Sequence, residues 1–194
     1  MPLWGERARP RLLAAGFAIW IFLVPFHAQG VEGVERLDVQ PDPAGGVRGT
    51  ARLVFPVKPD VIQSILTDYP KWPELFETRM RVASLVVEQD VATVDVRIVH
   101  TLLPGERRLV SETRALPGGG ILTELKAGDF KRYHRRWILS PVADGQQTNA
   151  EFELIVQIDS IVPDWLIALA MRQELETHFR ILREKALLQA MPGK

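Results

Sequence analysis

The 194-residue sequence contains no cysteine. This absence excludes disulfide bonds, thiol nucleophiles, cysteine-ligated zinc and a lipidated N-terminal cysteine. Histidine is also scarce, and after residue 30 only His100, His134 and His178 occur, with no two at the spacing of a metal-binding pair. The sequence also has no Gly-x-Ser-x-Gly nucleophile motif. We therefore predict no metal, no cofactor and no catalytic residue.

The sequence has no net charge, because 24 Lys and Arg residues balance 24 Asp and Glu residues. A general nucleic-acid binder needs a basic surface, so we predict no nucleic-acid partner. The composition, with 46% apolar and 25% charged residues, is that of an ordinary globular protein. The length suits one domain.

No uncharged stretch before residue 30 has the length and apolar character of a full membrane span, which needs about 20 apolar residues. Residues 12–26 instead form a shorter apolar run that follows three arginines, and residues 28–30 (Ala-Gln-Gly) offer small residues at a cleavage site. This pattern predicts a signal peptide over residues 1–30 and a secreted or periplasmic protein. The alternative is an uncleaved N-terminal anchor in the membrane.

Residues 31–47 are expected to form a leader segment. The glycines and prolines in its second half indicate a loop or an irregular strand. The alternation over Val47–Phe55 predicts the first regular strand. A short helix is expected from Pro59 to the residue before Asp68, followed by a second short helix or turn around Trp72–Phe76.

Six more strands of alternating character are separated by turn signals and predict an antiparallel meander. They are expected at residues 80–88, 92–103, 107–116, 121–127, 132–139 and 148–158. Their outward positions are polar, so the sheet needs cover on one face only.

A long helix from Pro163 to about Ala190 supplies that cover, because apolar residues recur at every third or fourth position. They are Ala168, Met171, Leu175, Phe179, Leu182 and Ala186. We therefore predict an α+β helix-grip fold, in which a curved antiparallel sheet of about seven strands surrounds a long C-terminal helix, with two short helices after strand one. A sheet curved in this way usually leaves space beside the helix.

Several residues carry a resemblance to a known superfamily: Asp68-Tyr69-Pro70, Trp72-Pro73, Phe130, Tyr133, Trp137 and Ser140-Pro141. With the order of elements, they make residues 48–191 similar to START-like proteins, which include polyketide cyclases, lipid-transfer domains and coenzyme Q-binding proteins. The spacing is most similar to the coenzyme Q-binding branch. The resemblance implies a lipid-like or isoprenoid ligand, such as a quinone, held between sheet and helix for transport or sequestration.

Arg135 is the sharpest functional signal. Tyr133, Arg135 and Trp137 share one face of their strand, and a tryptophan there favours the interior. A buried charge is costly unless it is paired or meets a polar group of a ligand. The alternative places Arg135 at the mouth of the cavity, in water or paired with a carboxylate such as Asp95 or Glu112.

We predict ligand contacts at ten residues: Trp72, Phe76, Val96, Tyr133, Arg135, Trp137, Phe152, Leu154, Trp165 and Leu169. For each apolar residue the alternative is an ordinary core position. Residues 165–171 are apolar around the whole helix, so this segment must be buried, cover the cavity entrance, or contact a membrane or partner. We favour cavity cover and keep transient membrane contact as the alternative.

Two other functions stay open beside the exported binding protein. A cyclase or dehydratase would need a buried acid or base in the same cavity, and the strand carboxylates available for it are Asp95, Glu112 and Glu124, which the pattern does not place inside. The third hypothesis is an interaction module without a ligand, held at the membrane by its N-terminus.

Overall fold

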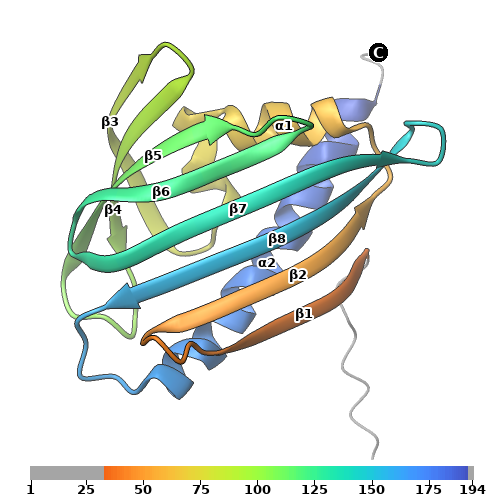
Figure 1. The fold of residues 1–194 in the computed structure, drawn as a ribbon. Coiled ribbons are helices and arrows are strands. Elements are labelled where there is room, and N and C mark those ends of the chain that lie inside the picture. Colours follow the sequence, from red (N-terminus) through yellow and green to blue (C-terminus); the bar gives the residue numbers. More distant parts are fainter. Residues whose placement is uncertain (1–32, 192–194) are drawn as a thin grey trace, which may run out of the picture.

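In the computed structural model, which describes residues 33–191, eight antiparallel strands form one curved sheet that wraps around a long helix (Figure 1). The strands are β1 (Val34–Pro41), β2 (Val47–Phe55), β3 (Arg79–Glu88), β4 (Val91–Val99), β5 (Glu106–Ala115), β6 (Gly120–Gly128), β7 (Phe130–Val142) and β8 (Gln147–Ile158). The helices are α1 (Pro59–Thr67), the 3-10 helix η1 (Tyr69–Leu75) and α2 (Asp164–Ala190). The order across the sheet is β1-β2-β8-β7-β6-β5-β4-β3. The predicted α+β helix-grip fold is confirmed.

The sheet has one strand more than the predicted seven, because β1 lies in the segment expected to be a leader. Leu37 and Val39 of β1 pack against the core, and the strand pairs with β2 along its length. Gly45 and Gly46 have positive φ angles and turn the chain back into β2. The glycines therefore mark one tight turn and not a long loop. The predicted signal peptide lies outside the described residues.

The long helix α2 crosses the concave face of the sheet and packs against β1, β2 and α1 (Figure 1). Its buried side chains are Ala168, Leu175, His178, Phe179, Leu182 and Ala186. The predicted apolar stripe is confirmed, except that Met171 is half-buried, and the structure adds His178 to it. Asp164 fixes the start of the helix, because its carboxylate accepts a hydrogen bond from the Gly46 backbone at 3.1 Å.

The glycine turn between β5 and β6 brings α1 close to the centre of β7. Gly120 has a φ of 105°, and a Cβ there would overlap the Trp137 carbonyl oxygen. Only glycine allows this close approach. The Gln63 side chain of α1 accepts from the Gly120 backbone N–H at 3.0 Å and donates to its carbonyl at 3.3 Å. These contacts hold α1 close to the part of β7 that carries Trp137.

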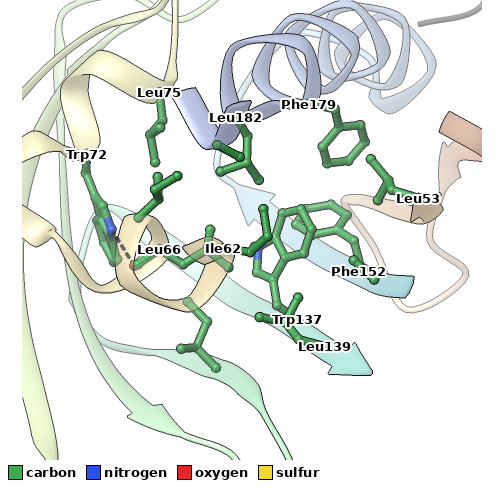
Figure 2. Close-up of a cluster of buried hydrophobic side chains, with 14 of the residues drawn as sticks. Leu53, Ile62, Leu66, Trp72, Leu75, Trp137, Leu139, Phe152, Phe179 and Leu182 are labelled. Carbon is green, nitrogen blue, oxygen red and sulfur yellow. Dashed lines mark hydrogen bonds between the residues drawn. The ribbon is translucent and has the colours of Figure 1, made fainter. Parts of the chain in front are cut away.

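Three aromatic rings fill the space between sheet and helix at this end of the molecule (Figure 2). Trp137 of β7 lies with its ring centroid 4.7 Å from that of Phe152 on β8 and 5.8 Å from that of Phe179 on α2. Phe152 and Phe179 are 5.2 Å apart, and the pairs with Phe179 are edge-to-face. This part of the predicted cavity is therefore packed core.

We expect Phe179→Ala to lower the free energy of unfolding by about 3 to 5 kcal/mol, because it leaves a cavity among well-packed rings. Leu188→Ala is the control on the same helix, since Leu188 is 68% exposed, and it should change stability by less than about 0.5 kcal/mol. Urea denaturation of both variants measures the difference. Equal effects would contradict the placement of the helix.

Candidate functional site

Strand β7 presents Tyr133, Arg135 and Trp137 to the concave face, as predicted. Arg135 is only 4% exposed. Its neighbours across the sheet are Thr123 on β6 and Leu154 on β8. The hydroxyl groups of Thr123 and Thr113 form a hydrogen bond of 3.0 Å. The guanidinium therefore lies inside the protein, over a sheet surface of mixed polarity.

The carboxylates considered as partners for Arg135 lie on the other face of the sheet. Asp95 accepts two hydrogen bonds from Arg108, at 2.8 and 3.0 Å, and Glu112 pairs with Lys126 at 2.5 Å. The alternative of a neutralising pair with Asp95 or Glu112 is therefore wrong. The reason is strand parity, because Asp95 alternates with the core residues Val94 and Val96.

The Arg135 guanidinium contacts an aromatic ring instead of a carboxylate. Arg135 Cζ lies 4.4 Å from the centroid of Trp72, which is a cation–π contact. Trp72 is held in place because its indole N–H donates to the Leu66 carbonyl at 2.9 Å (Figure 2). The Nε and Nη2 atoms of Arg135 are buried and have no hydrogen-bond partner within residues 33–191. Burial also raises the pKa of the adjacent Tyr69, while the charge of Arg135 acts in the opposite direction.

His178 of α2 is a second buried polar residue, close enough to Arg135 to be affected by its charge. Its ring stacks on Phe76 with 4.4 Å between centroids and is 6.1 Å from Trp137. Its Nδ1 atom is 2.9 Å from the Leu75 carbonyl oxygen. Burial lowers the pKa of His178 to about 4, the Leu75 bond opposes this shift, and the charge of Arg135 adds to it. The imidazole is therefore neutral at neutral pH.

Four buried polar atoms at this place have no hydrogen-bond partner in the described part of the chain. They are Nε and Nη2 of Arg135, Nε1 of Trp137 and Nε2 of His178. Buried polar atoms are normally paired, so four such atoms on neighbouring side chains are unusual. Together these side chains form the polar cluster, a set of groups able to form hydrogen bonds with the polar end of a ligand.

Half-buried apolar side chains pack against the buried core on the concave face. They are Met80, Val82, Leu85, Ile98, Leu125, Phe130, Tyr133, Leu154 and Met171. Most come from strands on the β3–β7 side of the sheet, whereas α2 packs mainly on β1 and β2. They lie among fully buried residues of the same strands, such as Val94 and Leu109.

A cleft of about 390 Å³ opens between α2 and the adjoining ends of β3 and β4. Its walls include Thr78, Val99 and Glu174, and Glu174 lies one helical turn before His178. Two larger clefts, of about 660 and 710 Å³, lie on the outer face of the sheet and beside the C-terminal end of α2. None of these three clefts has Arg135 or His178 in its wall. The smaller cleft reaches α2 one helical turn from His178.

The structure brings together most of the predicted ligand contacts. Trp72, Val96, Arg135, Trp137 and Phe152 are buried, and Phe76, Tyr133 and Leu154 are half-buried. Trp165 and Leu169 are 63% and 52% exposed, so the expectation that they cover the cavity is wrong. They lie four residues apart on a flank of α2, while Ala168 faces the sheet.

His178 was not among the ligand contacts expected from the sequence. Its position three residues after Leu175 and four before Leu182 places it on the buried stripe, and this spacing was the available signal. Its contact with the 3-10 helix η1 joins residues far apart in the chain, so no local sequence pattern could predict it.

Glu124, the third carboxylate considered for catalysis, also lies on the outer face and pairs with Arg114 at 2.9 Å. With Asp95 and Glu112, all three strand carboxylates are paired with cations away from the polar cluster. None of the helices within residues 33–191 is long and apolar enough to span a membrane.

No family model matches the sequence, and no curated protein matches it. Solved structures do match. A START superfamily protein from Mycobacterium smegmatis is 15% identical, covering 74% of this chain and 99% of its own, with a TM-score of 0.59. A STAR-related lipid transfer protein from Xanthomonas axonopodis is 16% identical, covering 82% and 97%, with a TM-score of 0.65. An aromatase/cyclase from a Streptomyces species is 11% identical, covering 79% and 94%, with a TM-score of 0.56.

These matches define the class of fold, which is the START-like helix grip. The chain therefore has the fold that its residues resemble.

We expect the protein to lose stability between pH 6.5 and pH 4, because the unfolded chain binds a proton at His178 that the folded chain does not. The contribution is complete above pH 6.5 and lost by about pH 4, on the order of 3 kcal/mol at most. His178→Phe should flatten this part of the curve, and His134→Phe on the outer face should not. Urea denaturation across the range measures it, and an unchanged slope in His178→Phe would contradict the assignment.

Proposed function

We propose that the protein is an exported carrier that holds a lipid-like or isoprenoid molecule beside α2, with the polar end of the ligand at Arg135. The unpaired burial of the Arg135 guanidinium supports this proposal. The half-buried apolar surface next to it would receive the apolar part of the ligand. The matched lipid transfer protein and aromatase/cyclase share this fold, and their names favour an apolar ligand here too.

The energetics of Arg135 favour a ligand over a purely structural role. Removing a charge from water costs several kcal/mol, and a cation–π contact returns about 2 kcal/mol when desolvated. The deficit persists in the ligand-free protein because two of the guanidinium nitrogens lack an acceptor among the described residues. An oxygen atom of a ligand would complete the hydrogen bonds of these nitrogens and offset the deficit on binding.

The apolar part of the ligand supplies most of the driving force. Burial of apolar surface contributes about 25 cal/mol per Å² before the entropic costs of binding. Many lipids fit such a surface, so the polar end determines which is selected. A quinone is one ligand of this kind, in keeping with the spacing typical of coenzyme Q-binding proteins.

Transport or sequestration fits the site better than acid–base catalysis. An enzyme of the cyclase or dehydratase type needs a proton donor or acceptor in the cavity, and the strand carboxylates considered for that role point to the other face. The remaining candidate is His178, and it is a weak base because burial lowers its pKa to about 4. Transient contact with a membrane is part of the proposal, because Ile161 is 97% exposed next to the exposed Trp165.

We expect Arg135→Met to weaken the binding of 1-decanol at least tenfold, because the variant lacks the donors for the ligand oxygen. The same change should leave the free energy of unfolding unchanged or raise it by about 1 to 3 kcal/mol, since an unpaired buried charge is removed. Calorimetric titration and urea denaturation measure the two effects.

The matched control is Arg136→Met, one residue along β7 on the exposed face. It should retain the affinity of the wild type. If Arg135→Met binds 1-decanol as tightly as the control does, Arg135 is not in the binding site.

The proposal as a whole is tested by native mass spectrometry of the protein purified from the export compartment without detergent, followed by organic extraction. We expect a chain that begins at Val31 and a stoichiometric lipid or quinone. An intact residue 1–30 segment would favour the anchored alternative. An empty protein that takes up none of a panel of lipids and isoprenoids would contradict the carrier function.

A further inference from the structure

The polar cluster contains one acceptor, and its identity follows from the tautomer of His178. The Leu75 carbonyl can only accept a hydrogen bond, so the proton between the two groups must lie on His178 Nδ1. A neutral imidazole carries one N–H, so Nε2 has a free lone pair. This atom is buried and has no donor partner among residues 33–191.

The other members of the polar cluster can only donate. A guanidinium has no acceptor, and an indole nitrogen is a donor only. Arg135 and Trp137 are two positions apart on β7, and the Trp137 ring centroid is 6.1 Å from that of His178. The polar cluster therefore offers donors from the sheet and one acceptor from the helix.

We propose that the ligand carries a hydroxyl group at its polar end, whose hydrogen is donated to His178 Nε2 while an oxygen atom accepts from Arg135. The ligand class is an apolar alcohol, phenol or enol. An ether, ester or ketone supplies the acceptor alone, and so does an ionised carboxylate. This inference rests on the proposed carrier function. It adds that the carrier selects ligands with a hydroxyl group at the polar end.

The position of His178 suits this selective role. Phe76 stacks on one side of the ring and Leu75 holds Nδ1, so the direction of the Nε2 lone pair is fixed. A site with a buried acceptor rejects an analogue that lacks the matching donor, because the acceptor would stay unpaired in the complex.

The test compares two isomers, 1-decanol and 1-methoxynonane, which have the same atoms and differ in the hydroxyl hydrogen that only the alcohol can donate. We expect the wild-type protein to bind 1-decanol about tenfold more tightly in calorimetric titrations. Equal affinities would overturn the hydroxyl assignment and leave the carrier function standing. Binding of neither isomer would contradict the carrier function and this inference with it.

Two variants of His178 test whether this residue causes the preference for 1-decanol over 1-methoxynonane. In His178→Asn the amide nitrogen can replace Nδ1 and donate to Leu75, but no acceptor replaces Nε2, so the preference should disappear. In His178→Gln the longer side chain can place its carbonyl oxygen where Nε2 was, so a preference should remain. His134→Asn, on the outer face of β7, is the control and should keep the tenfold ratio.

A preference that survives in His178→Asn would overturn the role of His178. If that variant does not fold, the wild-type ratio and the Gln variant still decide the question, because loss of the preference in a folded Gln variant would contradict an acceptor role at this position. Arg135→Met should weaken both isomers to a similar extent, since both present an oxygen to the guanidinium.

Discussion

The burial of one guanidinium, that of Arg135, constrains the surrounding structure. A cation with little access to water needs an electron-rich neighbour, and the Trp72 ring at 4.4 Å provides one. That ring is held by a bond to the last turn of α1, and α1 is held in turn by the glycine hairpin through Gln63. The short helices after β2 therefore do more than connect strands, because they position the aromatic surface on which the charge rests.

The same charge influences the state of its neighbours. Burial keeps His178 neutral, and the positive field of Arg135 acts in the same direction. A neutral histidine bonded to a backbone carbonyl has one defined tautomer, and its second nitrogen is then an acceptor. Burial is the larger cause of the neutral state of His178, and the charge of Arg135 adds to it. The acceptor character of Nε2 follows from burial together with the hydrogen bond to Leu75.

Sequence patterns predicted the parts of the fold that depend on periodicity. The alternation in β7 placed Arg135 and Trp137 inside, and the spacing on α2 gave its buried stripe. Three features depend on tertiary contacts and were not accessible. The pairing of β1 depends on a partner strand, the bond of His178 joins residues 103 positions apart, and the exposure of Trp165 depends on where the sheet edge lies. A helix turn that is apolar on every side does not show which side the sheet will cover.

The concave face divides into two parts with different physical roles. Around Trp137, Phe152 and Phe179 the rings are in contact, and this packing supplies stability. On the β3–β7 side half-buried residues such as Met80 and Leu125 lie among fully buried ones such as Val94. In the proposed complex the polar end of the ligand would rest near the rigid aromatic core and its apolar end on the half-buried residues, so that selectivity and affinity would come from different elements of one fold.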